Sequence, residues 1–414
     1  MSHWSSRSGQ HAAEPFPRLR VVAVYAVLLM LLGVLMAVRL HGVSGNAYTR
    51  MATAFLAGRL DVAANLHDAA IVSGRGYYPF GPVPAVFLMP FVAAFGPGVP
   101  NTVIGVGALV AALPALLRLL TREIAERAQA GWWLLAAVAG TPLLMCAFAD
   151  NPYYAAHVLV VACLAWALVL ALDGRGALCA GVLVGLAAAT RLDAAGAFIP
   201  ISLLYLSRPT QGSATARWRP IVGVGAGLTP FLLLIGWYNA ARFGSPFESG
   251  YALQNIDYPW LIALRNQGLF SVRHVPENLY YFLIAGPIVA GSAAVPSAFP
   301  WIVPSEWGLG LLWTSPWLLL GLSARGRQSA IVALGAILVL LPSLLYYGVG
   351  WIQFGYRYGL DALPFLLLLA VAGARRLAVG SRILLVLFTV ALVVNAWGDL
   401  WLMGIWGVPR AYTG

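Results

Sequence analysis

Long apolar stretches, separated by short polar segments, fill most of this chain and predict a bundle of membrane-spanning helices. A spanning helix needs about 20 mostly apolar residues, and eleven segments come close to that length. The predicted spans are 20–38, 100–119, 131–148, 154–172, 177–191, 193–207, 220–238, 308–322, 329–348, 358–373 and 382–402. The pattern therefore predicts an all-α polytopic membrane protein with about eleven transmembrane helices.

The segment 79–96 is also apolar, but its prolines favour a different arrangement. Counting it as a further crossing would move Arg118, Arg122 and Arg127 to the side where arginines are scarce. Treating it as a re-entrant or surface-lying helix keeps them with the other loop arginines, as the positive-inside rule expects. We therefore expect 79–96 to return to the side from which it starts.

With that topology the charges sort by side. One face carries 15 arginines and 4 carboxylates, and the other carries 10 arginines and 10 carboxylates. The chain has no lysine. Because cytoplasmic loops are enriched in basic residues, the arginine-rich face is predicted to be cytoplasmic and the more acidic face extracytoplasmic.

The amino-acid composition restricts the class of protein further. The chain is 61% hydrophobic and 9% charged, whereas soluble domains carry about 25% charged residues. The excess of basic over acidic residues reflects arginines in the loops and does not indicate nucleic-acid binding. The three cysteines lie in apolar runs without metal-ligand spacing, and the histidines are scattered, so we expect neither a metal nor a cofactor. No cleavage site follows the first apolar run, which predicts an uncleaved anchor.

Two regions on the acidic face are too long and too polar to be simple turns, namely 40–99 and 239–307. We expect juxtamembrane helices in them and place the function there. The predicted organisation is a cytoplasmic tail at 1–19, one transmembrane domain at 20–402 that includes both outer loops, and a tail at 403–414.

Carboxylates are scarce, so those at the outer boundary are candidates for chemistry. Asp61 and Asp68 lie in the first outer loop, and Asp150 follows the third predicted span. A sugar transferase needs a carboxylate to accept the acceptor's hydroxyl proton, which is general-base catalysis. The alternatives are a solvated loop position for Asp61 and Asp68, and an N-cap of the next helix for Asp150.

Charged residues also interrupt apolar runs. Arg191 and Asp193 lie at a corner between two helices or line a polar cavity, since charges inside spans are costly. Arg357 and Asp361 are spaced i, i+4 and could pair on one helix face. Alternatively, an arginine at the mouth of a span could hold a phosphate, because its planar fork matches phosphate oxygens.

Paired tyrosines recur near the outer boundary, including Tyr77 and Tyr78. Their ordinary role is the interfacial aromatic belt, and stacking on a sugar is the alternative. Together with His67, these two tyrosines are the candidates for contacting substrate.

Several local motifs together resemble the GT-C membrane glycosyltransferases, in particular those similar to the dolichyl-phosphate-mannose protein mannosyltransferases. The motifs are AFLAGRLD (54–61), HD (67–68), GYYPFGPVPA (76–85), GLAAATR (185–191), YNAARFGSPF (238–247) and QFGYRY (353–358). The resemblance spans residues 20–400 and rests on the order of the motifs more than on any one of them.

The resemblance implies a GT-C-like bundle that transfers a sugar, mannose or similar, from a polyprenyl-phosphate donor with inversion and without a metal. The acceptor would be an extracytoplasmic glycan, lipid or protein, and the enzyme would sit in a bacterial plasma membrane. Arg357, Arg242 and Arg191 would meet the donor phosphate. Relatives usually carry an acidic residue early in the first outer loop, where this chain has Asn46; the expected base is therefore Asp61, Asp68 or Asp150.

The alternative function is a transporter or a flippase for lipid-linked sugars. It would use Arg191, Asp193, Arg357 and Asp361 as a polar pathway. Transporter folds tend to show paired helices, broken by glycine or proline, in matching halves, and no such pair occurs in this sequence.

Overall fold

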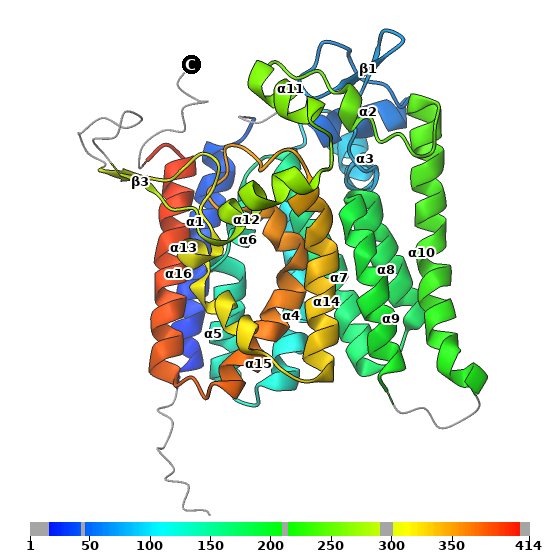
Figure 1. The fold of residues 1–414 in the computed structure, drawn as a ribbon. Helices are drawn as coiled ribbons and strands as arrows, with labels where there is room; N and C mark the ends of the chain where they lie inside the picture. Colours follow the sequence, from blue (N-terminus) through cyan, green and yellow to red (C-terminus); the bar gives the residue numbers. More distant parts are fainter. Residues whose placement is uncertain (1–15, 43–45, 209–213, 290–300, 406–414) are drawn as a thin grey trace, which may run out of the picture.

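The computed structural model describes residues 16–42, 46–208, 214–289 and 301–405. Long helices run side by side through the bundle, and short helices and hairpins cover one end of it (Figure 1). We call that end the loop-bearing face. Most of the predicted tails 1–19 and 403–414 lies outside the described residues.

Within the described residues, seven helical segments are long and apolar enough to cross a membrane. Each coincides with a predicted span. They are α1 (Leu19–Arg39), α4 (Thr102–Glu123), α7 (Pro152–Asp173), the Trp218–Phe243 part of α10 (Ala214–Phe243), α14 (Arg327–Leu345), η5 (Arg357–Ala362) with α15 (Leu363–Arg376), and α16 (Ser381–Leu402). The prediction of an all-α polytopic membrane protein is confirmed.

The other four predicted spans are short or broken helices. Proline and glycine interrupt the i→i−4 hydrogen bonds or the helical backbone, and Pro142 stands at one of these breaks. The segments are α5 (Arg127–Ala139) with α6 (Leu143–Phe148), α8 (Ala177–Thr190), the 3₁₀ helix η1 (Leu192–Ala197) with α9 (Phe198–Leu206), and α13 (Leu311–Thr314) with η4 (Pro316–Ser323). Broken helices leave backbone and polar groups inside the bundle, where a site can form.

The loop-bearing face is built from both long loops. The first loop contributes α2 (Ala47–Leu56), the hairpin β1 (Ala70–Val72) and β2 (Arg75–Tyr77), and α3 (Val83–Phe95). The second contributes η2 (Tyr251–Leu253), α11 (Pro259–Asn266), η3 (Val272–His274), α12 (Val275–Leu283), and the hairpin β3 (Ile288–Val289) and β4 (Ile302–Val303). The expected juxtamembrane helices are therefore present.

Asp150 shows that the first loop begins and ends on the same side. Its carboxylate accepts from the backbone N–H of Gly42, just after α1, at 3.0 Å. It also accepts from the backbone N–H of Asn101, just before α4, at 2.8 Å. The segment 79–96 therefore does not add a crossing, and α3 lies with α2 near the loop-bearing face (Figure 1).

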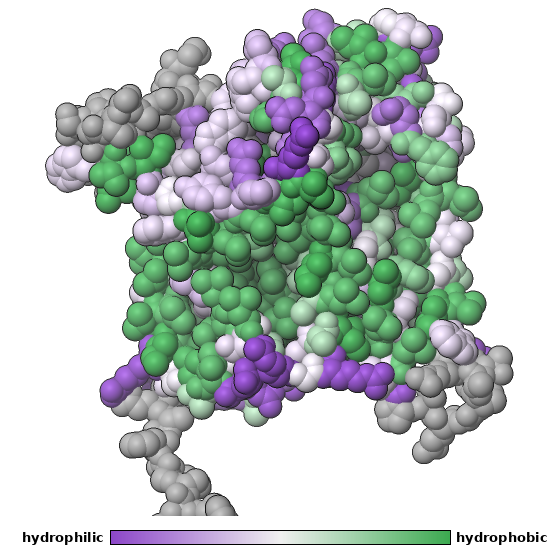
Figure 2. All heavy atoms as spheres, in the orientation of Figure 1, coloured by the Kyte–Doolittle hydropathy of each residue, from purple (hydrophilic) through white to green (hydrophobic). Residues whose placement is uncertain are grey.

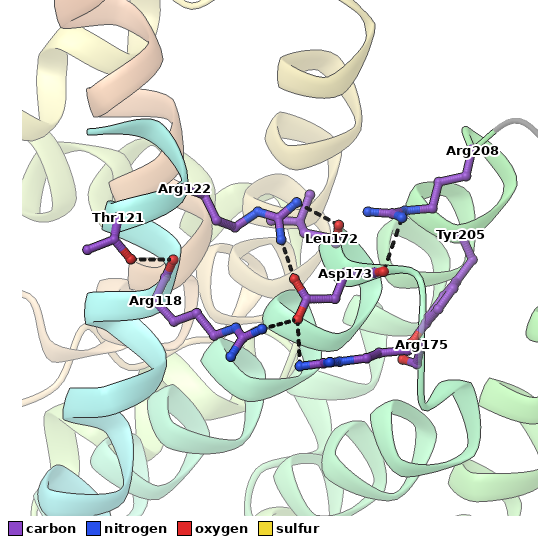
Figure 3. A network of polar contacts seen from close by, with 8 residues as sticks. All are labelled: Arg118, Thr121, Arg122, Leu172, Asp173, Arg175, Tyr205 and Arg208. Atoms are coloured by element: carbon purple, nitrogen blue, oxygen red, sulfur yellow. Dashed lines mark hydrogen bonds and ion pairs between the residues drawn. The ribbon is translucent and has the colours of Figure 1, made fainter. Parts of the chain in front are cut away.

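An apolar band separates two polar ends of the molecule (Figure 2). At the end opposite the loops, arginines from the ends of three helices bind Asp173 (Figure 3). Arg118 and Arg175 bind its carboxylate at 2.7 and 3.1 Å, Arg122 binds it as well, and Arg208 donates to its carbonyl at 3.1 Å. This network fastens α4, α7 and α9 together at the arginine-rich face.

Candidate active site beneath the outer loops

Asp68 of the first outer loop reaches the start of α7. Its carboxylate accepts a hydrogen bond from the Tyr153 hydroxyl, and Nε2 of His67 lies 3.6 Å from it. Its backbone is in the left-handed region, with φ of 62°, which is uncommon for a residue other than glycine. The side chain remains 20% exposed. Asp68 is therefore a positioned carboxylate that solvent or substrate can still reach.

The second outer loop holds Asp68 from the other side. Its backbone N–H donates to the carbonyl of Asn255 at 3.1 Å, and Gln254 donates to its carbonyl at 3.3 Å. His67 Nδ1 lies 2.8 Å from a carboxylate oxygen of Asp257. The two long loops thus form one layer, with Asp68 and His67 at their junction.

The other two candidate aspartates are placed differently. Asp61 pairs with Arg59 at 3.2 Å on the surface. Asp150 is 1% exposed, and its carboxylate is occupied by backbone and side-chain N–H groups of Asn101 and by Gly42. The alternative of Asp150 as the N-cap of the next helix is wrong, because Asn151 caps α7 by accepting from the backbone of Tyr153.

The charged residues predicted at a corner join a buried network. Asp361 is fully buried and accepts from Arg191 Nε at 2.7 Å, with His157 Nδ1 on its other oxygen at 2.7 Å. Arg191 also pairs with Asp193 at 2.9 Å, and Ser343 donates to Asp193 at 3.1 Å. This network connects α7, α8, η1, α14 and η5, so Arg191 lies at a polar corner between two helices, which was the first of the two alternatives.

The predicted i, i+4 pair between Arg357 and Asp361 does not form. Residues 357–362 adopt a 3₁₀ helix, which has three residues per turn, so positions four apart point in different directions. Asp361 turns to Arg191, and Arg357 is left without that carboxylate.

Arg357 is consequently an unusual cation. It is 7% exposed, and no carboxylate of the described residues lies within ion-pairing distance of it. Its NH1 donates to the Gln353 side chain at 2.9 Å, whereas its Nε is buried without a partner. The guanidinium lies over the rings of Tyr358 and Tyr154, at 4.9 and 5.8 Å. Tyr154 adjoins Tyr153, so Arg357 and Asp68 flank the same end of α7.

Arg242 has a different environment from Arg357. Its three guanidinium nitrogens donate to the carbonyl of Tyr238 at 3.1 Å, the carbonyl of Tyr78 at 2.5 Å and the side chain of Asn239 at 2.9 Å. The guanidinium also lies 3.5 Å from the centre of the Tyr238 ring. These contacts tie the loop before α3 to the end of α10 and use the nitrogens that a phosphate would need.

Tyr77 and Tyr78 face the protein. Both are buried, Tyr77 edge-on to Phe243 and Tyr78 stacked on Phe80. Burial raises the pKa of Tyr78 above its ordinary value. Phe80 in turn meets Tyr153 edge-on. The interpretation of these two tyrosines as a lipid-facing aromatic belt is therefore wrong; they support the wall of the site at Tyr153.

Tyr153 and His157 were not among the site residues predicted from the sequence. Both lie on α7, four residues apart, so they share a face of that helix. A histidine inside a predicted span is a signal of function or of a buried polar pair, and it could have directed attention to this face. The described residues contain no group of three or more histidine, cysteine or acidic side chains arranged to hold a metal ion.

The described residues form a polytopic all-α membrane protein, and this fold is similar to that of solved membrane protein structures. No protein-family model matches the chain, and no curated protein matches it significantly.

The solved structures with this fold include ArnT from Cupriavidus metallidurans bound to undecaprenyl phosphate. It matches with a TM-score of 0.50 and 13% identity, over 87% of this chain and 61% of ArnT. The apo state of ArnT gives a TM-score of 0.50 and 13% identity, over 86% and 60%. The oligosaccharyltransferase AglB from Archaeoglobus fulgidus, in complex with an inhibitory peptide and a dolichol-phosphate, gives 0.46 and 14%, over 94% and 56%. The chain thus spans about 61% of the length of the ArnT structure.

The buried network yields a prediction about stability. Replacing Arg191 with leucine leaves the fully buried Asp361 without its cation, and breaking a buried pair in this way costs about 3–5 kcal/mol. The matched control is Arg175→Gln, which removes an arginine that is 63% exposed from the Asp173 network and should cost about 0.2–1 kcal/mol. Chemical unfolding in mixed micelles measures both. Equal losses for the two variants would contradict a special role for the buried network.

Proposed function

We propose that this protein is a glycosyltransferase that moves a sugar from a polyprenyl-phosphate donor to an acceptor at the loop-bearing face. The observation that carries the proposal is Arg357, a buried arginine at that face with no carboxylate partner among the described residues. A buried charge is costly unless it is paired. An anion bound during function would supply the missing partner.

A phosphate fits this position better than other anions. The guanidinium presents a planar set of N–H donors that matches phosphate oxygens, and its Nε–H has no partner of its own. ArnT, which shares the fold, was solved with undecaprenyl phosphate. As the sugar leaves, charge builds on the phosphate, and a fixed positive group there lowers the barrier.

Asp68 is the proposed general base. It is positioned by Tyr153 yet partly exposed, whereas the carboxylate of Asp150 is saturated and Asp61 is paired on the surface. In the reaction, the acceptor hydroxyl loses its proton to Asp68 as its oxygen bonds to the anomeric carbon. The bond from that carbon to the phosphate oxygen breaks, and the phosphate leaves with the electron pair. Attack opposite the phosphate inverts the anomeric centre.

The remaining candidates then have supporting roles. Arg191 is engaged by two carboxylates and Arg242 by carbonyl and amide oxygens, so we assign both to positioning. The charged groups around Asp361 pair with one another inside the bundle. This pairing disfavours a transport pathway, which requires polar side chains that face a water-filled cavity.

The arginine-rich face is proposed to be cytoplasmic, in keeping with the positive-inside rule, and the site then faces the outside of a bacterial plasma membrane. Sugar-phosphate lipids and acceptors would meet at that surface.

Native mass spectrometry tests donor binding directly. After incubation with undecaprenyl phosphate, the protein is expected to carry one added lipid mass, and Arg357→Gln should lose most of that species. The matched control, Arg273→Gln, replaces an exposed arginine of the second loop and should bind like the parent protein. A parent protein that binds no polyprenyl phosphate would overturn the proposal.

A further inference from the structure

Four aromatic side chains, from the second outer loop and from the segment between α14 and η5, meet in one cluster. They are Tyr258, Trp260, Trp307 and Trp351, which we call the aromatic cluster. Ring centres are 4.9 Å apart for Tyr258 and Trp351, 5.2 Å for Trp260 and Trp307, and 6.2 Å for the stacked pair Trp307 and Trp351. None of the four is fully buried, and Trp260 is 42% exposed. The cluster therefore offers ring surface to a ligand.

The location of the cluster argues against a role in the bilayer. Trp260 belongs to α11, which lies at the loop-bearing end of the molecule (Figure 1). Tyr258 is the residue just before α11, and the other two rings contact these. The rings of an interfacial aromatic belt face the lipid headgroups, whereas the rings of this cluster lie against one another and against His67.

Polar groups surround the rings and connect them to the proposed site. His67, which lies edge-on to Tyr258 at 6.0 Å, lies beside Asp68 and approaches Asp257. Trp351 Nε1 donates to Glu306 at 3.3 Å, and the carbonyl of Trp351 lies 3.5 Å from Arg357 NH1. The aromatic cluster is thus continuous with both the proposed base and the proposed phosphate site.

We propose that the aromatic cluster binds the saccharide part of the acceptor. This inference rests on the proposed function, because it takes Asp68 as the group that activates the acceptor hydroxyl. Flat rings stack on the C–H faces of sugar rings, and the surrounding carboxylates and imidazole accept and donate hydrogen bonds to hydroxyl groups. A hydroxyl-rich, uncharged chain of sugars matches this combination.

A peptide acceptor fits less well. Extended peptides commonly bind by adding a strand to a free sheet edge. In the hairpin of the first loop, the edge of β2 is bridged by Val62 at Gly76, and the edge of β1 is bridged by Gln254 at Ala70. Each edge of this hairpin is therefore bridged at one position by a neighbouring segment, which leaves it less open to an added strand.

The test is binding of donor-free protein in nanodiscs to an array that carries neutral oligosaccharides of mannose, galactose, glucose and arabinose together with a peptide set. We expect binding to at least one oligosaccharide series. Trp260→Ala should weaken it about tenfold, equivalent to about 1.4 kcal/mol, and Trp260→Phe should restore most of it. The matched control is Trp237→Ala. This residue is also an exposed tryptophan, at 60%, but it lies on α10 and is not part of the aromatic cluster.

The outcomes separate this inference from the function on which it rests. Binding to peptides alone, or equal glycan binding by the parent and Trp260→Ala proteins, would overturn the saccharide site. Undecaprenyl phosphate binding in the native mass spectrum would still support the transferase in either case. Conversely, glycan binding without binding of the lipid phosphate would support the saccharide site and contradict the proposed reaction.

Discussion

Asp68→Asn is expected to lower kcat about 10²–10⁴-fold, the usual contribution of a general base. Asparagine keeps the shape of the side chain and can still accept from Tyr153, but it cannot take the proton of an acceptor hydroxyl. Turnover should be measured with the polyprenyl-phosphate sugar that the native mass spectrum identifies. The KM for that donor should change little, because Asp68 acts on the acceptor.

The control for this variant is Asp61→Asn in the same loop. Asp61 pairs with Arg59 at the surface, so its loss should leave kcat within about twofold, as for a surface substitution. If Asp61→Asn abolished turnover while Asp68→Asn retained it, Asp61 would be the base and the assignment made from the geometry of Asp68 would be wrong.

Arg357→Gln is expected to slow the chemical step about 10²–10³-fold, the effect of removing one fixed electrostatic stabiliser. Glutamine can still hydrogen-bond within the site but supplies no positive charge as the phosphate departs. Single-turnover measurements with bound donor isolate this step from donor binding. The single-turnover rate of Arg357→Lys should fall between those of the parent protein and Arg357→Gln, since lysine keeps the charge and loses the planar fork.

Folding must be checked in the same samples. Thermal unfolding of Arg357→Gln should resemble that of the parent protein, because Arg357 has no carboxylate to leave unpaired among the described residues. The exposed Arg273→Gln serves again as the matched control. Near-normal single-turnover rates in a folded Arg357→Gln protein are incompatible with Arg357 as the phosphate-binding residue.

Much of the fold was predictable because the bilayer imposes a simple rule on the sequence. Apolar runs of spanning length marked the crossings, and the loop arginines marked their direction. The breaks were harder to place. The span at 131–148 divides at Gly140–Pro142 into α5 and α6, and 357–362 winds as a 3₁₀ helix. Hydropathy reports burial and gives no information on helix type, so neither feature was visible in it.

The candidate site was predictable only in part. The sequence marked outer-loop acids and boundary arginines as candidates, and the structure places two of them, Asp68 and Arg357, at the same end of α7. The sequence alone could not rank Asp61, Asp68 and Asp150, because the partners of Asp68 and Asp150 lie far away in the chain, whereas Asp61 pairs with nearby Arg59. Asp150 meets Asn101, and Asp68 meets Tyr153 and Asn255. His157, a polar residue inside an apolar span, was not among the predicted site residues either.

The sequence by itself determined the partition between lipid and water, because that depends on runs of neighbouring residues and on local charge. Only the tertiary structure decided which charged groups pair with each other. Asp361 pairs with Arg191 from another helix, 170 positions away, and among the described residues this leaves the buried Arg357 without a carboxylate partner. Ion pairs between distant helices depend on how those helices pack, and the pattern of residues along the chain does not contain this information.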